Sequence, residues 1–181
     1  TFTYGIAGDP GSAMNPFTTE DRYGMMVLQA VYSTLAYVAD DGTVTYNLAE
    51  GVETSDDGTV LTAHLREGVT WSNGEPFTSA DVVFTFEEKE SDPIANGYYN
   101  LTYGDGSQVK VEAVDDLTVT FTFPVADPTA LSKISNEMWI APEHMYKDVE
   151  DWENNDVNTH PVGTGPYILD EYAPGQYVRF R

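Results

Sequence analysis

Residues 65–86, LREGVTWSNGEPFTSADVVFTF, contain most of the information about the fold of this chain. The stretch begins at the end of an alternating pattern typical of a strand. It then contains two glycines suited to turns, and it ends in an apolar pattern typical of a helix. Thr78 precedes Asp81 at the spacing of a capping box, which predicts a helix that begins there and continues to about Glu88. Trp71 and Phe77 lie in the connecting segment, where we expect them to fill a core. The stretch therefore predicts a strand, an aromatic loop and a helix that pack together.

Hairpins and short helices surround this unit along the chain. A helix is expected from about residue 19 to residue 35, where apolar residues recur at three- and four-residue steps. Alternating segments around turn-forming residues predict hairpins at 37–46, 52–65, 109–123 and 167–180, and a short strand at 2–7. Short helices are expected after Asp127 and at 142–146, and polar loops at 91–106 and 148–158. This order predicts a mixed α/β (α+β) fold with dominant antiparallel pairing.

Composition excludes several classes of protein. The 181 residues suit one domain, or one domain with a small subdomain, and 41% hydrophobic residues are ample for a core. Eight Lys and Arg against 30 Asp and Glu leave a net charge of −22, which excludes a binder of nucleic-acid phosphates. The acids are spread from Asp9 to Glu171, which indicates a solvated, repulsive surface suited to a secreted or high-salt setting. No apolar segment reaches the ~18 residues of a membrane span.

Motifs for catalysis, metals and cofactors are missing from the sequence. There is no Gly-x-Ser-x-Gly elbow, and the three histidines, at 64, 144 and 160, are dispersed. The acidic segment 148–156 lacks the glycine and the terminal glutamate spacing of a calcium loop, and the absence of cysteine excludes a thiolate site. We therefore predict a protein without enzymatic activity, cofactor or metal. A hydrolase remains an alternative, with Ser12 and His64 as the residues to mutate.

A second distinctive stretch, residues 161–167, reads PVGTGPY, and its glycines and proline suggest a tight passage back to a central sheet. Further motifs lie before it, in this order: Asn15-Pro16, Leu48-Ala49-Glu50, Ser55-Asp56-Asp57-Gly58, the stretch 65–86, and the hairpin Val114–Val119. Together they resemble the N-terminal lobe of a family 5 extracellular solute-binding protein. That family is the peptide- and nickel-binding class that delivers ligands to ATP-binding cassette importers.

The resemblance implies a periplasmic-binding-protein type II-like lobe that is incomplete. Residues 1–48 and 156–181 would form the central part of lobe I, with the first strand, the first helix and the returning strands. Residues 49–155 would form an inserted subdomain, and the second lobe would be absent. Because such proteins close two lobes on a ligand, we expect this chain alone to bind ligand weakly or not at all.

The resemblance also indicates ligand-facing loops. It places residues 8–12 at the cleft, where backbone groups can receive an extended peptide by strand addition. The candidates in this segment are Asp9, Gly11 and Ser12; Asp9 would meet a ligand amine or, alternatively, cap its own turn. The second candidate loop contains Tyr98, Tyr99 and Asn100, whose tyrosines would form apolar walls or, alternatively, pack as ordinary loop residues.

The function implied by the resemblance is ligand capture for a membrane permease of an ATP-binding cassette importer. Oligopeptides are the leading ligand class, and nickel chelates, opines and oligosaccharides remain open. A stand-alone surface interaction module without a transport role is the alternative function. We expect an acidic, extracytoplasmic protein, periplasmic or attached to the cell surface, with a lipid anchor on a preceding segment as one means of attachment. We expect no nucleic-acid partner and no membrane insertion by this chain.

Overall fold

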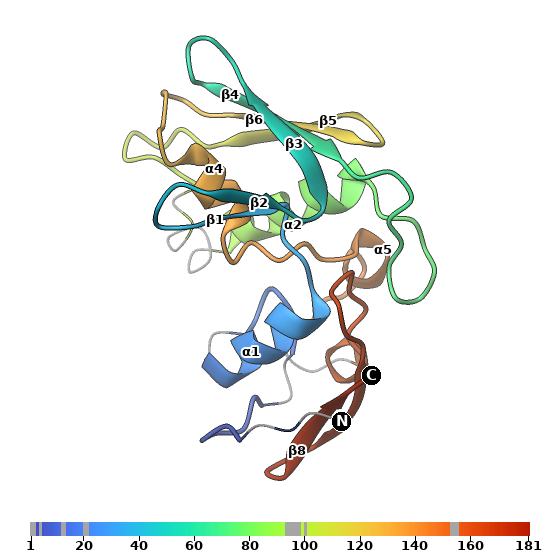
Figure 1. The fold of residues 1–181 in the computed structure, drawn as a ribbon. Coiled ribbons are helices and arrows are strands. Elements are labelled where there is room, and N and C mark those ends of the chain that lie inside the picture. The colour runs from blue at the N-terminus through green and yellow to red at the C-terminus, as the bar shows by residue number, and fades with distance from the viewer. Residues whose placement is uncertain are drawn as a thin grey trace.

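The computed structural model describes residues 3, 5–11, 14–19, 22–92, 99, 101–152 and 156–181. Figure 1 shows two parts, an upper sheet with helices beneath it and a lower part that contains both ends of the chain. In chain order, and with the labels of Figure 1, the elements are α1 (Arg22–Val31), β1 (Ala36–Val38), β2 (Val44–Tyr46), β3 (Ala49–Thr54), β4 (Val60–Leu65), α2 (Ser79–Ser91), β5 (Lys110–Asp115), β6 (Thr118–Thr122), α4 (Ala130–Ser135), α5 (Glu143–Tyr146), the 3-10 helix η1 (Asp156–Thr159), β7 (Leu169–Ala173) and β8 (Tyr177–Phe180).

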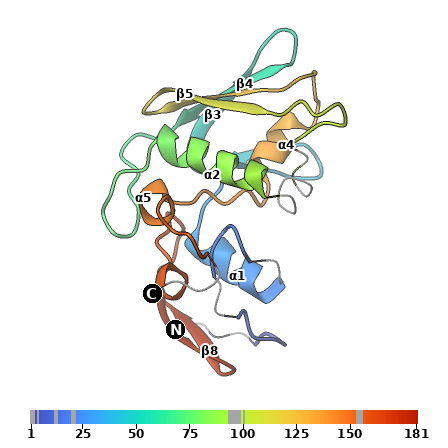
Figure 2. The same ribbon diagram turned by 180° about the vertical axis from the view of Figure 1, so that it is seen from behind.

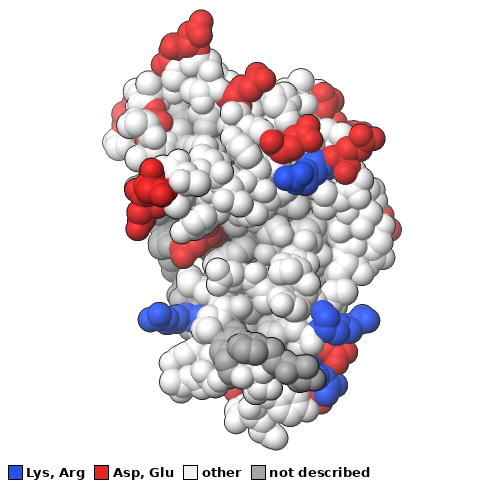
Figure 3. All heavy atoms as spheres, viewed as in Figure 1, with Lys and Arg blue, Asp and Glu red and all other residues white. Residues whose placement is uncertain are grey.

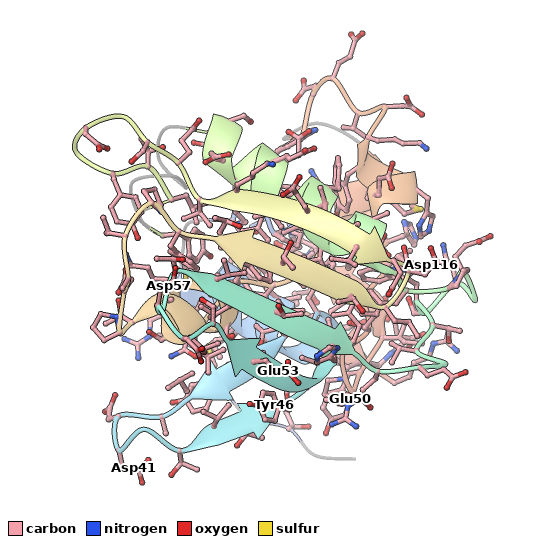
Figure 4. All side chains as sticks on the ribbon, turned by 90° about the horizontal axis from the view of Figure 1, so that it is seen from above. Asp41, Tyr46, Glu50, Glu53, Asp57 and Asp116 are labelled. Carbon is pink, nitrogen blue, oxygen red and sulfur yellow. The ribbon has the colours of Figure 1, made fainter. Side chains whose placement is uncertain are left out.

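The upper sheet is antiparallel throughout, with the strand order β3-β4-β6-β5. Alternate residues of its two central strands point inward, and Leu61, Ala63, Val119 and Phe121 are almost completely buried there. Helix α2 packs beneath β5 and β6 and closes this core. Seen from above in Figure 4, the sheet leaves its outer face uncovered by helices. The alternating burial follows from strand geometry, in which successive side chains point to opposite faces of the sheet.

The stretch 65–86 folds around the carboxylate of Asp81. One oxygen accepts hydrogen bonds from the Thr78 amide at 2.9 Å, as the capping box predicts, and from the Trp71 indole at 3.2 Å. The other oxygen accepts from the Glu143 amide at 2.9 Å, at the start of α5. Trp71 and Phe77 are buried with their rings edge to face, which confirms that the loop fills the core. One carboxylate thus holds the aromatic loop, α2 and α5 together.

The lower part of the molecule consists of α1 packed against the β7–β8 hairpin. The buried face of α1, with Val27, Leu28 and Val31, shares a cluster with Leu169 of β7 and the half-buried Phe180 of β8. Both ends of the chain lie beside this hairpin in Figure 1. The predicted hairpin at 167–180 is confirmed, with its strands at 169–173 and 177–180. The first helix and the last hairpin are therefore packed together although they are far apart in sequence.

The first helix is shorter than predicted, because it ends at Val31 rather than near Leu35. The carbonyl of Val31 accepts from the Gly165 amide at 2.7 Å, and that of Ala30 accepts from the Tyr167 amide at 3.2 Å. These distant donors take the carbonyls that a longer helix would use for its own next turn. The returning chain therefore ends the helix.

Three smaller predictions differ from the structure. The strand expected at 2–7 falls partly outside the described residues, and the described residues 3 and 5–7 form no strand. The helix expected from Asp127 begins at Ala130, and the loop expected at 148–158 ends in η1. In the described part of the chain, no helix has the length and apolar character needed to cross a membrane.

Candidate functional site

Asp9 lies in the exposed N-terminal segment and is bonded to the turn of the last hairpin. Its carboxylate accepts hydrogen bonds from the Tyr172 hydroxyl and the Gly175 amide, and from the Gly11 amide at 3.0 Å. The Tyr172 hydroxyl first, and then the two amides, lower the pKa of the Asp9 carboxyl below its usual value. The side chain therefore holds residues 9–11 against the β7–β8 turn while it stays exposed to solvent.

Two glycines near Asp9, at positions 8 and 11, are each required for a different structural reason. Gly11 has φ +73, a conformation that side chains disfavour, and it closes the turn that Asp9 caps. Gly8 packs closely against the ring of Tyr23 in α1, where an added Cβ would come within 2.1 Å of a ring carbon. Ser12 lies outside the described residues. The segment is thus shaped by a turn at one side and by close packing on α1 at the other.

Tyr99 is the one described residue of the second candidate loop, since Tyr98 and Asn100 lie outside the described residues. Its side chain is only 8% exposed and belongs to the core beneath the upper sheet. The hydroxyl donates to the carbonyl of Glu137 at 2.9 Å. This geometry matches the loop-packing interpretation of Tyr99.

Lys89 joins the upper and lower parts of the molecule, and it is not among the site residues predicted from the sequence. Its ammonium group donates to the carbonyl of Pro16 and lies 5.5 Å from the ring centroid of Phe17 and 5.3 Å from that of Tyr99. The residue is 4% exposed, and this burial lowers its pKa to about 8. The signal in the sequence is helical spacing, because Lys89 follows the buried Val82 and Phe86 on one face of α2.

Asn15 explains why the chain carries an Asn-Pro pair before α1. The side-chain oxygen of Asn15 accepts from the amides of Phe17 and Thr18 at 2.9 and 3.0 Å. Its amide group donates to the carbonyl of Trp152 at 3.0 Å and to the side chain of Asn158 at 2.7 Å. The pair therefore fixes the entry to α1 and binds it to the segment around η1.

The histidines lie apart in the structure as well. His64 faces Glu53 at 3.7 Å on the upper sheet, His144 bonds Asn73 at 2.9 Å, and His160 bonds Thr159 at 2.9 Å. Across the described ranges, no group of three or more His, Asp or Glu side chains is placed to hold a metal ion. Of the two hydrolase candidates, Ser12 lies outside the described residues. His64 lies beside the Glu53 carboxylate on the upper sheet.

An antiparallel sheet above a helix, joined to a lower part in which α1 packs against the β7–β8 hairpin, defines the class of protein. It is part of a periplasmic binding protein of type II. The family model for bacterial extracellular solute-binding proteins, family 5 Middle, matches residues 43–181, and the chain belongs to this family. Members of the family are extracytoplasmic solute-binding proteins rather than enzymes.

Individual relatives agree with this assignment. The chain is 32% identical over 162 residues to a probable peptide-binding protein YejA of Agrobacterium fabrum, covering 84% of this chain and 25% of that protein. The substrate-binding protein CtaP of Listeria monocytogenes superposes with a TM-score of 0.84 at 38% identity, over 97% of this chain and 35% of CtaP. The oligopeptide-binding protein AppA of Bacillus subtilis, solved with a nonapeptide, gives 0.78 and 25%, over 92% of this chain and 33% of AppA. The chain thus spans about a third or less of these relatives.

Proposed function

We propose that this chain is the first-lobe portion of the ligand-capturing component of an ATP-binding cassette importer, with oligopeptides as its ligands. The observation that carries the proposal is similarity along nearly the whole chain to a peptide-binding relative solved with a nonapeptide. The probable peptide-binding relative from Agrobacterium fabrum supports the same ligand class. The membrane permease of the importer is the expected protein partner, and a lipid anchor on a preceding segment is the expected attachment to the cell surface.

The ligand would contact the N-terminal segment around Asp9 and the loop around Tyr98. Asp9 and Gly11 are exposed while Pro10 between them is buried, and the bonds of Asp9 to the last hairpin hold the backbone of this segment in one conformation. A backbone held in this way can pair with an extended peptide at low entropic cost. Gly11, Ser12, Tyr98, Tyr99 and Asn100 complete the proposed set, with Tyr99 supporting the loop from the core.

The same reasoning supports a division of the chain into a central part and an insertion. Residues 1–48 and 156–181 would belong to the central part of the lobe, and residues 49–155 to the inserted subdomain. The two main buried clusters favour this division, since one gathers α1 with β7 and the other gathers the upper sheet with α2. Leu35 and Leu48 of the central part belong to the upper cluster, and Trp139 of the insertion belongs to the lower one, so the two parts are packed together across the boundary.

Native mass spectrometry of the full-length product, purified from its host, tests the ligand class. We expect a population of bound peptides that acid releases and tandem spectra identify. A bound nickel chelate, opine or sugar would contradict the peptide assignment while keeping the binding function. Calorimetry of the 181-residue chain with a peptide mixture should show no micromolar binding, because the opposite wall of the cleft is missing.

A further inference from the structure

Strand β5 forms an open edge of the upper sheet. Among the described residues, β6 is its only strand neighbour, and most of its side chains are exposed. Figure 2 shows β5 running across the molecule above α2. Edge strands carry outward N–H and C=O groups that can pair with another extended chain. Strand β5 therefore meets one requirement for strand addition, an open edge.

A groove lies along this edge, between β5 and α2, with a volume of about 350 Å³. Its apolar floor contains Phe86, Leu101 and Val109, all of which belong to the buried core. Its rim contains Glu87 and Glu90 of α2 and Glu112 of β5. The volume lies in the range of pockets that hold small ligands or peptide side chains. An extended chain beside β5 would place alternate side chains into this groove.

The rim of the groove favours a cationic occupant. Glu87 and Glu90 stand one turn apart on α2, and burial, together with the charge of Glu87, raises the pKa of Glu90. Among the described residues that line the groove, Lys110 is the one cation; it is paired with Glu112 at 2.8 Å, and its side chain is 66% exposed. A positive side chain between the glutamates of α2 would therefore be attracted by both carboxylates.

We propose that the groove binds an extended, basic segment of a partner protein, which adds to β5 as a fifth strand and places a Lys or Arg side chain between Glu87 and Glu90. A second copy of this chain fits the groove poorly, because its net charge of −22 would be brought against the same carboxylates. Strand β5 lies at the opposite end of the molecule from the β7–β8 hairpin in Figures 1 and 2, so the groove is separate from the part of the proposed ligand site around Asp9. Leu101 on its floor directly follows the second candidate loop.

The test uses the 181-residue chain and a capped seven-residue peptide of alternating valine and lysine. Amide shifts in NMR spectra should change at residues 110–115 and remain constant at 9–11, with a dissociation constant between about 0.05 and 1 mM. The same peptide with glutamate in place of lysine should bind at least about tenfold more weakly, since it reverses the charge complementarity. N-methylation of alternate amides along one edge of the lysine peptide should abolish binding in one register and preserve it in the other.

Glu87→Gln is the matched change in the protein, and Glu75→Gln is its control, because Glu75 is exposed on a loop away from the groove. We expect Glu87→Gln to weaken lysine-peptide binding about threefold or more and Glu75→Gln to leave it unchanged. No binding at 1 mM, equal binding of the glutamate peptide, or shifts confined to 9–11 would overturn the proposal. Shifts at 110–115 that depend on protein concentration without peptide would assign the edge to self-association instead. A failure here leaves the mass-spectrometric test of peptide capture unaffected.

Discussion

The amide of Gly165 donates to the carbonyl oxygen of Val31 at 2.7 Å, and this contact caps the last turn of α1 with a residue from the other end of the chain. Two residues earlier, Gly163 lies against the same carbonyl. The backbone of the segment 163–166 therefore packs directly against the backbone of α1, where a side chain would not fit. This packing explains the glycines without a role in ligand binding.

Replacing Gly163 by alanine should destabilise the chain by about 3 kcal/mol, since overpacking against an immobile backbone is costly. An added Cβ would lie 1.9 Å from the Val31 carbonyl oxygen, and only movement of α1 could relieve the clash. Urea unfolding monitored by circular dichroism measures the change. Gly104→Ala is the control, because nothing lies within 4 Å of the added atom, and it should change stability by no more than about 0.5 kcal/mol. Equal stabilities of the two variants would contradict the close approach.

Lys89→Met should make the stability of the chain less dependent on alkaline pH. The pKa of Lys89 falls from 10.5 to about 8 in the fold, so the unfolded chain binds more protons between these values. Stability should therefore rise with pH through this window in the wild type, relative to the variant. The shift corresponds to about 3 kcal/mol at most, offset in part by the Pro16 carbonyl and the two rings at neutral pH.

Urea unfolding of both proteins at several pH values from 7 to 10 measures this difference. We expect the methionine variant to be as stable as the wild type or more stable at pH 7, since apolar side chains often replace buried charges without loss. Subtracting the two curves removes the contributions that the two proteins share. Parallel curves would show that Lys89 keeps its ordinary pKa.

Asp9→Asn should loosen the last hairpin at neutral pH. The Asp9 carboxylate accepts three hydrogen bonds. In asparagine one of the two oxygens is replaced by an NH2 group, which cannot accept a hydrogen bond, so at least one of the three bonds would be lost. Hydrogen exchange followed by mass spectrometry should become faster at residues 173–177. In the wild type, the lowered pKa of Asp9 means that its contribution is present above the ordinary pKa and is lost as the pH falls toward the lowered value. Asp41→Asn, which changes another exposed turn-capping carboxylate, should leave exchange in the hairpin unchanged.

Salt should stabilise the chain. Figure 3 shows carboxylates spread over the upper half of one face with few cations among them, consistent with the net charge of −22. Their mutual repulsion is screened over ~10 Å at 0.1 M salt and over ~3 Å at 1 M. We expect the melting temperature to rise by about 5 °C between 0.05 and 1 M KCl. At pH 4 many carboxylates are protonated, so the same titration should give a much smaller rise.

Local patterns in the sequence were sufficient for the two hairpins of the upper sheet and for the start of α2, but not for the pairing of β4 with β6 that joins the hairpins. Alternation identifies the buried residues of β4 and β6, and the spacing of Thr78 and Asp81 identifies the start of α2, because each depends on neighbours in the chain. The burial of Trp71 could also be predicted, because its hydrogen-bond partner Asp81 lies only ten positions away in the sequence.

Partners distant in sequence explain what could not be predicted. The end of α1 depends on donors from residues 165–167, and the role of Asp9 depends on Tyr172 and Gly175, which are 163 and 166 positions away. Lysine is usually found on the surface, and only the helical spacing of Lys89 indicates that it is buried. For the candidate site, the sequence indicated two loops, but it could not show that Tyr99 faces the core.

The bond between Gly165 and Val31 has a kinetic consequence. Beside it, the Ser33 hydroxyl donates to the Thr164 carbonyl across 131 positions, so the junction is a contact of very high sequence separation. The β3–β4 and β5–β6 hairpins of the upper sheet depend on contacts between neighbours in the chain, so we expect them to form before this junction, whose closure orders a much longer loop. Mutations at the junction should therefore accelerate unfolding more than they slow folding, and α1 should gain protection from exchange after β4 and β6 during refolding.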